Sequence, residues 1–333
     1  MDIAIIGAGP AGLFAAFEAG RLGLSSCIID ALDFIGGQCI ALYPEKPIYD
    51  IPACPAILAK DLITNLKTQA GRFAPIYHLG QRVEKISGRA SQWQLVTSVG
   101  NIIEAKAIII AAGCGAFGPN RPRIEGIEQY EGKTVFYLVH RPEDFAGKKV
   151  VIAGGGDSAA DWAIALAGVA KNVYLVHRRD KFRCTASSTL KLRQMADVGS
   201  LEIVTPYHLH DISGSGGMIN KVILRSLAGS MKEIEADILL PFFGLSMDLG
   251  PIAGWGLDIE RKRIKVSPET LVTSTPGIYA IGDVVTYPGK LKLILSAFAE
   301  AAMACRSIYS LVHPDNILNF EYSTNSGVFD EAL

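Results

Sequence analysis

The chain has 333 residues, of which 49% are apolar, and its formal net charge is −1. This length allows about two domains, each large enough to bury its own core. The balanced charge gives no support for a nucleic-acid partner or an anionic membrane surface, and no apolar run reaches the roughly 18 residues of a membrane span. We therefore expect a soluble globular protein with no nucleic-acid or membrane partner.

The cysteines give an expectation for the cell compartment. Six are present, at positions 27, 39, 54, 114, 184 and 305, and no two of them form a CxxC pair. Scattered cysteines of this kind are typical of buried or incidental thiols in a reducing compartment, so we expect a cytoplasmic protein. His208 and His210 have no evident third ligand nearby, and no metal site is predicted.

The first predicted strand, residues 3–6, runs directly into a glycine-rich turn. Gly7, Gly9 and Gly12 have the spacing GxGxxG, and a helix-compatible segment follows them. At a strand-to-helix turn such glycines let the backbone approach a pyrophosphate, which the helix N-terminus attracts. A second apolar strand ends in Asp30, where a carboxylate can hold the 2′-hydroxyl of an adenosine ribose. Although glycines also mark ordinary tight turns, this context predicts dinucleotide binding.

The segment after Asp30 carries two adjacent glycines, Gly36 and Gly37, followed by Gln38 and the aromatic Tyr43. A Pro-rich region comes next. This composition fits a loop that passes beneath an extended cofactor, and it fits an ordinary surface loop equally well. The spacing alone leaves both interpretations open.

The next elements complete the first half of the chain. We expect a helix at residues 60–69 and a short strand at 76–79. Three strands that suit a small meander follow at 83–86, 93–97 and 102–104, and a continuous apolar run at 107–112. A continuous apolar run is typical of a strand buried in a parallel sheet. It ends in the flexible break Gly113, Cys114 and Gly115, and we place a domain boundary there.

The chain then repeats its opening. A second buried strand, residues 150–153, leads into a turn that contains Gly154, Gly156 and Ser158, and a helix follows. The third glycine position of the motif is Ala159, which still permits close packing of that helix. The repeat predicts a second dinucleotide site.

The residue that occupies the position of Asp30 in the repeat is His177. It opens a cationic stretch that includes Arg178, Arg179 and Arg183. Guanidinium groups bind a phosphate in bidentate fashion, whereas a carboxylate would repel the 2′-phosphate of NADP(H). The stretch therefore favours NADP(H) over NAD(H) at the second site, the alternative being a solvated basic loop after a strand.

The rest of the chain is predicted as short strands, a return crossing and a long helix. The strands are expected at residues 201–204, 207–212, 222–226 and 233–240, the crossing at 241–250, a buried strand at 278–281 and the helix at 291–311. The buried strand is followed directly by Gly282 and Asp283. The tail after His313 has no regular hydrophobic pattern.

These motifs recur in the same order in a known family. The two glycine turns, the loop GGQ at 36–38, the sequence AAG at 111–113 and the sequence AIGD at 280–283 resemble flavoproteins with two dinucleotide-binding domains. The chain is similar to the ferredoxin–NADP⁺ reductases of the thioredoxin-reductase-like type, from Asp2 to about Thr324. The resemblance implies an α/β fold with two Rossmann-like three-layer domains in a homodimer. Residues 1–115 and 246–333 would form a discontinuous FAD-binding domain, and residues 116–245 an inserted NADPH-binding domain.

The resemblance also implies where FAD contacts the chain. Asp30 is expected at the adenosine ribose, Gln38 at the flavin region, and Tyr43 stacked on one face of the isoalloxazine. The other expected contacts are Val83 at the adenine end, Phe117 and Thr324 near the flavin, Asp283 at a ribityl hydroxyl or the diphosphate, and Tyr322, from the partner subunit, on the other flavin face.

Thioredoxin reductases themselves carry a redox-active CxxC just before the second glycine turn. The corresponding residues 137–142 of this chain contain no cysteine. Disulfide exchange needs an attacking thiolate and a resolving partner. Electrons that reach the flavin are therefore expected to leave for an acceptor outside the chain.

The implied function is electron transfer between NADP(H) and ferredoxin through FAD. NADPH would give a hydride to flavin N5, and single electrons would then reach an iron–sulfur ferredoxin or a flavodoxin. Hydride transfer requires no side-chain acid or base, so no catalytic residue is expected. Alternatives are a reductase of another acceptor such as a quinone, a flavin monooxygenase, and a non-enzymatic redox sensor. Basic residues that could dock an acidic ferredoxin, although surface lysines are usually just solvated, are Arg121, Arg123, Lys148, Lys149, Lys290 and Lys292.

Overall fold

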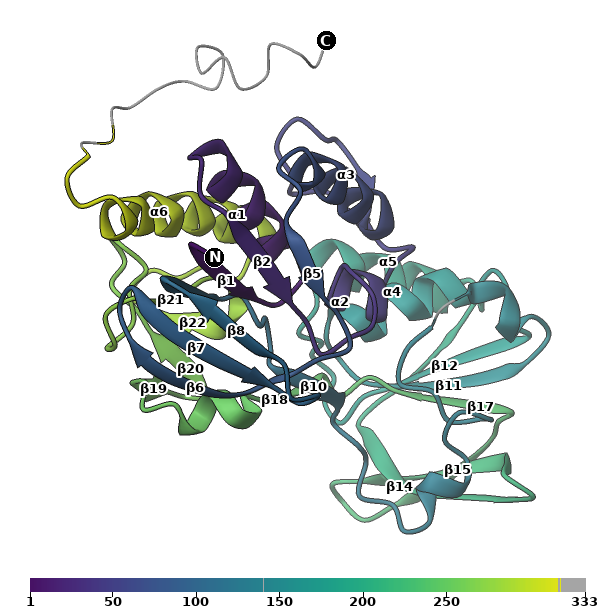
Figure 1. Ribbon diagram of the computed structural model, residues 1–333. Coiled ribbons are helices and arrows are strands. Elements are labelled where there is room, and N and C mark those ends of the chain that lie inside the picture. Colours follow the sequence, from purple (N-terminus) through teal and green to yellow (C-terminus); the bar gives the residue numbers. More distant parts are fainter. Residues whose placement is uncertain (140, 317, 319–333) are drawn as a thin grey trace. The chain divides into compact units, whose positions relative to one another are not determined.

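The structure is a computed structural model that describes residues 1–139, 141–316 and 318, the side chains of residues 116–119 and 245–247 excepted. The chain divides into two compact units (Figure 1). The first unit comprises Met1–Phe117 and Met247–Leu333, and the second comprises Gly118–Ser246. The sequence places the corresponding boundaries after residues 115 and 245.

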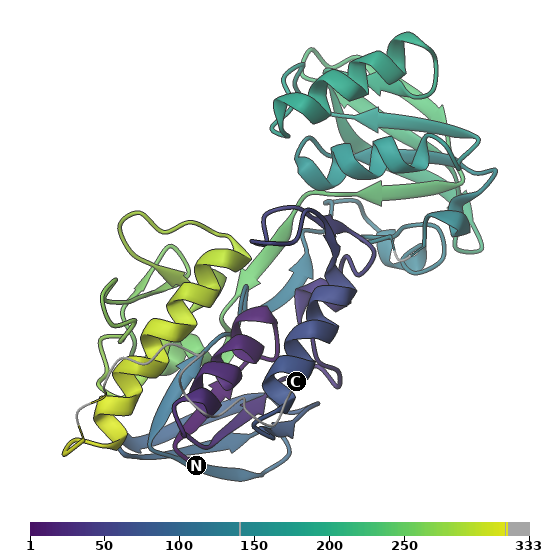
Figure 2. The same cartoon turned by 90° about the horizontal axis from the view of Figure 1, so that it is seen from above.

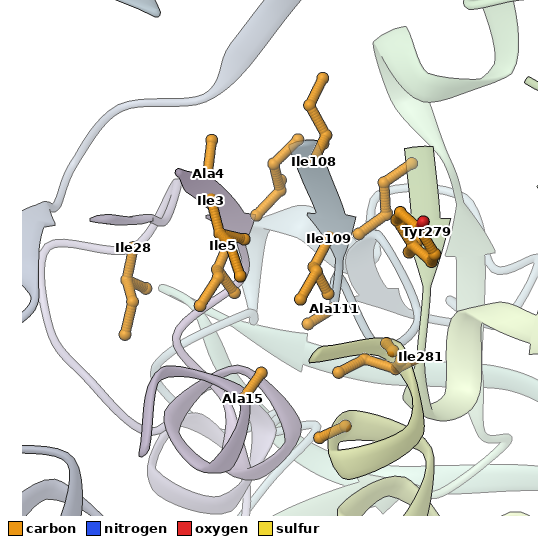
Figure 3. Packing of buried hydrophobic residues seen from close by; sticks show 14 of the residues in the cluster. Ile3, Ala4, Ile5, Ala15, Ile28, Ile108, Ile109, Ala111, Tyr279 and Ile281 are labelled. Atoms are coloured by element: carbon orange, nitrogen blue, oxygen red, sulfur yellow. The ribbon is translucent and has the colours of Figure 1, made fainter. Parts of the chain in front are cut away.

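The first unit is centred on a five-stranded parallel sheet. Its order is β21-β9-β1-β2-β5, formed by Ile278–Ala280, Ala107–Ile110, Ile3–Ile6, Ser26–Ile29 and Ile76–His78. The first four of these strands are buried along their whole length, as expected for strands covered on both faces. Figure 3 shows Ile3 and Ile5 of β1 and Ile108 and Ile109 of the neighbouring β9 packed in this core.

Helices and a meander cover the two faces of this sheet. Helices α1 (Pro10–Arg21), α3 (Ala59–Gly71) and α6 (Ile294–Val312) lie side by side on one face (Figures 1 and 2). The other face carries the antiparallel meander β6-β7-β8, formed by Val83–Arg89, Gln92–Thr97 and Ile102–Ala105. Strands β7 and β8 alternate buried and less buried residues because only one of their faces meets the sheet.

The second unit repeats this layering around a four-stranded parallel sheet. Its order is β13-β12-β11-β17, formed by Glu202–Val204, Asn172–Val176, Lys149–Ala153 and Ile238–Pro241. The covering elements are α4 (Asp157–Leu166), α5 (Ala186–Asp197) and the antiparallel meander β14-β15-β16, formed by Tyr207–Ser215, Met218–Ser226 and Met231–Glu235.

Alternate residues of β11 point to the two covering layers. Val150 and Ile152 share a core with Leu166 of α4 and with the buried Leu192 of α5. Their neighbours Val151 and Ala153 share a different core with residues of β15. Because successive side chains of a strand point to opposite faces, one short apolar strand supports both layers. Both units are therefore three-layer α/β structures with Rossmann-like parallel sheets, which confirms the predicted fold class.

The remaining elements are short. They are α2 (Gln38–Ala41), β3 (Pro47–Ile48), β4 (Ile57–Leu58), β10 (Ala116–Pro119), β18 (Leu245–Asp248), β19 (Ile259–Glu260), β20 (Arg263–Lys265), β22 (Val285–Thr286) and the 3₁₀ turns Ile127–Gln129, Pro142–Phe145, Gly250–Gly254 and Gly282–Val284. The two segments that join the units, β10 and β18, pair as a two-stranded ribbon.

One prediction about the second unit is wrong, and one helix of this unit was not predicted. Residues 233–240 form two strands in different sheets rather than one, because the backbone changes partner in the middle. The N–H of Ala236 still donates to Asn220 of β15, whereas the N–H of Asp237 donates to Lys149 of β11. The helix that was not predicted is α5, whose side chains are largely exposed and leave only Leu192 fully buried.

Candidate functional site

A cavity of about 500 Å³ lies in the first unit, a size typical of sites for small molecules and cofactors. It opens where the parallel strands end, with Ile6 of β1, Ile29 of β2 and Ala111 after β9 in its wall. In open α/β sheets, ligands bind outside the carboxyl ends of the strands. The position of the cavity therefore matches that of a dinucleotide site.

The first glycine turn forms one wall of this cavity. Gly7 has φ = +115°, and a Cβ built on it would lie 2.4 Å from the carbonyl oxygen of Ala111. A Cβ on Gly12 would lie 1.9 Å from the carbonyl oxygen of Gly7. Gly7 and Gly9 line the cavity. Gly12 does not line it and instead lets α1 approach the turn closely.

Asp30 follows β2 and ties the glycine turn to the cavity wall. Its carboxylate accepts hydrogen bonds from the N–H groups of Ala8 at 2.6 Å and of Leu32 at 2.9 Å. Burial raises the pKa of Asp30 above its usual range, and the two N–H donors oppose that shift. A carboxylate has about four acceptor positions, so this one can still accept a bond from a hydroxyl in the cavity.

The loop with two adjacent glycines also lines the cavity. Gly37, Gln38 and Tyr43 all contribute to its wall, which is where a loop that passes beneath a cofactor would lie. The buried Cys39 between them donates its thiol hydrogen to the Tyr43 hydroxyl oxygen at 3.8 Å. Burial raises the pKa of Cys39 to about 11 and raises the pKa of Tyr43 as well, so both stay protonated at neutral pH.

Two further predicted residues, Val83 and Asp283, line the same cavity. Three others cannot be placed there. Tyr322 and Thr324 lie outside the described residues, and the side chain of Phe117 lies outside the described side chains. The cavity thus brings together predicted residues from five separate stretches of the chain, namely Gly7 and Gly9, Asp30, Gly37 to Tyr43, Val83, and Asp283.

Sequence reasoning missed part of the wall. Gln81 and Arg82 belong to it, as does the segment 249–252 with Trp255. The start of α6, with Lys292, Leu293 and Ile294, also lines the cavity, and a helix N-terminus near Ser296 is expected there from the sequence. The segment 249–255 carries no motif. Its place in the wall follows from the return of the chain to the first unit.

The second glycine turn lies between β11 and α4 in the second unit. A Cβ on Gly154 would lie 2.6 Å from the carbonyl oxygen of Phe242, and one on Gly155 would lie 2.3 Å from the His177 ring. Gly156 is the N-cap of α4 and has open space around it. Ser158 is exposed in the first turn of that helix. The helix N-terminus is therefore accessible to an anion.

The predicted basic stretch lies beside this turn, because the N–H of Arg183 donates to the carbonyl oxygen of Gly155 at 2.7 Å. Arg178, Arg179 and Arg183 are exposed, and within the described residues none of the three has an ion-pair partner. His177 differs from them. Its ring is buried, stacks on Phe182 with ring centroids 5.5 Å apart, and covers Gly155.

His177 should make the stability of the second unit depend on pH. Burial, followed by the charges of Arg183, Arg178 and Arg179, lowers the pKa of His177 in the folded protein. The unfolded chain binds the proton first, so stability is full above about pH 6.5 and falls as pH drops through that value. We expect the urea midpoint to fall from pH 7.5 to pH 5.5 by more in the wild type than in His177→Gln. A matched His210→Gln control should behave like the wild type, and an identical pH dependence in all three would contradict this prediction.

One predicted surface cation is in fact buried. Lys290 was a candidate for docking an acidic partner, but its side chain is only 6% exposed and forms an ion pair with Glu300. It is therefore unavailable to a partner. Lys292, two residues further on, is exposed and lies at the wall of the cavity.

The described part of the chain holds no group of three or more His, Cys, Asp or Glu side chains able to bind a metal ion. Among the same residues, no helix is both long and apolar enough to cross a membrane.

The chain resembles known proteins over nearly its whole length. Residues 1–301 match the pyridine nucleotide-disulphide oxidoreductase family. The chain is 57% identical over 328 residues to a ferredoxin–NADP reductase of Granulibacter bethesdensis, covering 98% of this chain and 94% of that protein. It is 55% identical over 328 residues to a ferredoxin–NADP reductase of Paramagnetospirillum magneticum, covering 98% and 97%.

Solved structures of thioredoxin reductases share the fold. The enzyme of T. acidophilum has a TM-score of 0.81 and 27% identity, covering 93% of this chain and 97% of that one. The enzyme of Lactococcus lactis has a TM-score of 0.81 at 24% identity, covering 94% and 99%.

Proposed function

Because the chain belongs to the pyridine nucleotide-disulphide oxidoreductase family, and within it to the ferredoxin–NADP reductases of the thioredoxin-reductase-like type, we propose that it transfers electrons between NADP(H) and ferredoxin through FAD. The observation that carries this function is the likeness to named reductases over 98% of the chain. The cavity of the first unit and the basic turn of the second agree with it.

The residues of the first unit fit FAD. The glycine turn leaves no room for side chains between β1, β9 and α1, and the open N-terminus of α1 beside Gly9 suits a diphosphate. Asp30 and Asp283 would bind hydroxyl groups, and Tyr43 would contact the flavin ring. When bound, FAD supplies the redox chemistry, since it accepts electrons as a hydride and can release them singly.

The second unit would bind NADP(H). Gly154, Gly156 and Ser158 surround the N-terminus of α4, where the diphosphate would lie. The 2′-phosphate would be bound by Arg178, Arg179 and Arg183. The buried His177, which stacks on Phe182, would fix the position of the loop that carries them. These residues bind and orient the nucleotide, and none is proposed as a catalytic acid or base.

The arrangement of the cysteines bears on the identity of the electron acceptor. All six are free, and the sequence contains no CxxC pair. Thiol–disulfide exchange requires such a pair to relay electrons onward. An external one-electron acceptor, a ferredoxin or a flavodoxin, takes that place in our proposal. We also propose a cytoplasmic homodimer, the compartment being supported by the free thiols.

The test is a stepwise reduction of the purified yellow protein. NADPH added under anaerobic conditions should bleach the flavin absorbance within seconds, and oxidised ferredoxin should then restore it. A protein that bleaches but transfers electrons to quinones and not to ferredoxin would be a reductase of another acceptor. Nucleotide binding without turnover would identify a redox sensor, and a colourless protein that takes up no FAD would overturn the proposal.

Tyr43 gives a separate prediction for the flavin site. We expect Tyr43→Ala to weaken FAD binding about tenfold and to change the flavin absorption spectrum, because an aromatic contact and its buried area are lost. Tyr43→Phe, which keeps the ring and loses only the hydroxyl contact with Cys39, should stay close to the wild type. FAD titration and absorption spectra check both, and an unchanged Tyr43→Ala protein would remove the assigned contact.

A further inference from the structure

Glu300 of α6 is a buried carboxylate at the centre of a polar cluster in the first unit. One of its oxygens, Oε1, accepts a hydrogen bond from the Tyr287 hydroxyl at 2.7 Å and forms an ion pair with Lys290 Nζ. The other oxygen, Oε2, accepts from the N–H of Gly282 at 2.7 Å. The side chains of Glu300 and Lys290 are only 3% and 6% exposed.

A buried ion pair is weak evidence of stabilisation, because removing two charges from water offsets most of their attraction. The ion pair is informative instead through the segment that it attaches to α6. All three partners of Glu300 belong to one segment, residues 282–290, which connects β21 to α6. Glu300 therefore fixes this connection to the helix that follows it.

Both ends of that connection reach the cavity. Gly282 and Asp283 line it at the start, and Lys292, Leu293 and Ile294 line it just beyond the end. Between these points the segment pairs with a strand only at the short β22 (Val285–Thr286). The buried contacts of Glu300 add a second attachment, at both sides of that pairing.

The start of the connection leaves a backbone N–H that needs an acceptor. The N–H of Ile281 makes the last bond to the sheet, at 3.0 Å to the carbonyl of Ile110. Strand β21 lies at the edge of the sheet and Ile281 is still extended, so the N–H of Gly282, one residue on, points away from β9. The chain then turns out of the sheet at Gly282, whose φ is +81°. A buried N–H without an acceptor is unfavourable, and Glu300 provides one. Asp283, the next residue, is thereby placed at the cavity wall.

We propose that Glu300, held by Lys290 and Tyr287, is a positioning residue for the FAD cavity that sets the Gly282–Asp283 turn and the entry to α6. This inference rests on the proposed function, since it takes FAD as the occupant of the cavity. Glu300 does not line the cavity and acts only through the turn that it binds.

The test compares FAD affinity in full-length variants freed of flavin. In Glu300→Gln, the amide oxygen can replace only one of the two carboxylate oxygens, so the NH₂ group faces either the N–H of Gly282 or the ammonium of Lys290, and at least one donor loses its acceptor. We expect FAD to bind about tenfold more weakly, measured by quenching of flavin fluorescence, with an altered visible circular dichroism of the bound flavin. Tyr287→Phe removes a single donor and should weaken binding about threefold.

Glu18→Gln is the matched control. Glu18 is a buried carboxylate of α1, paired with Arg21 at 2.9 Å, and it does not line the cavity. Its substitution should lower the melting temperature while FAD affinity stays within about twofold of the wild type, which separates general destabilisation from positioning.

The outcomes are distinct. A wild-type protein that fails to bind FAD would overturn the proposed function, whatever the variants do. A wild type that binds FAD, together with a folded Glu300→Gln of equal affinity, would overturn the positioning role. If Glu300→Gln does not fold, Tyr287→Phe decides: wild-type affinity contradicts the role, and weakened affinity with a normal melting curve supports it.

Discussion

The Gly12→Ala variant is expected to lose FAD and to unfold several degrees below the wild type. Its new methyl group would lie 1.9 Å from the carbonyl oxygen of Gly7, so α1 would have to move away from β1. A clash with backbone cannot be relieved by a rotamer change, and we expect a loss of about 3 kcal/mol in the free energy of unfolding. Because the moved helix N-terminus no longer faces the diphosphate, cofactor binding should fail as well. Thermal unfolding followed by circular dichroism, and the flavin content after gel filtration, measure the two effects.

Gly9→Ala is the matched variant in the same turn. A Cβ on Gly9 has no heavy atom within 4 Å, and its φ of −73° suits any residue. The flavin-free variant should therefore have the same melting temperature as the flavin-free wild type. Since Gly9 lines the cavity, its methyl group would stand between the backbone and a closely approaching diphosphate, and FAD affinity should fall about tenfold or more. Wild-type FAD affinity in Gly9→Ala would contradict the placement of the dinucleotide in this cavity.

The double variant Arg178→Ala, Arg179→Ala should raise KM for NADPH about a hundredfold and leave KM for NADH within about twofold. Both guanidinium groups are exposed and have no ion-pair partner among the described residues, so they are available to the 2′-phosphate. A hydrogen bond to a charged group contributes about 1.5–3 kcal/mol, and only NADPH carries the group that receives it. Steady-state reduction of ferredoxin with each nucleotide measures the two constants.

Arg225→Ala is the control for the loss of positive charge. Arg225 is an exposed cation of the same unit, but it lies on β15 in the meander rather than beside the glycine turn. Its substitution should leave both constants unchanged. If the double variant raised KM equally for NADPH and NADH, the basic stretch would not be the site that distinguishes the two nucleotides.

Features encoded by neighbouring residues could be predicted from the sequence. Both glycine turns, the strands that precede them and the carboxylate or cations that follow depend on residues close together in the chain. The chemistry of each turn is local, because a strand end, a few glycines and a helix start suffice to make an anion site. The first cavity accordingly contains Gly7 and Asp30, which were predicted from such motifs, together with Gln38, Tyr43 and Asp283, which were predicted from the family resemblance.

The missed elements show where local pattern fails. Helix α5 buries almost nothing beyond Leu192, so it lacks the apolar periodicity that predicts a helix, although Thr185 accepts a hydrogen bond from the N–H of Ser188 as an N-cap. Residues 233–240 are continuous in pattern, yet the chain changes sheets at Asp237 because Lys149 of β11 offers its carbonyl there.

By itself, the sequence determined two dinucleotide-binding turns, their different charges and the lack of a CxxC pair, since each is a property of residue types at short spacing. Only the tertiary structure decided that Lys290 is buried against Glu300, that Gly12 packs against Gly7 without lining the cavity, and that the segment 249–252 forms part of its wall. The physical reason is that burial and partner choice depend on which distant segments the sheets bring together. The sequence around Gly282 does not show that its N–H will need an acceptor, because that need arises only where the chain leaves the sheet in the folded protein.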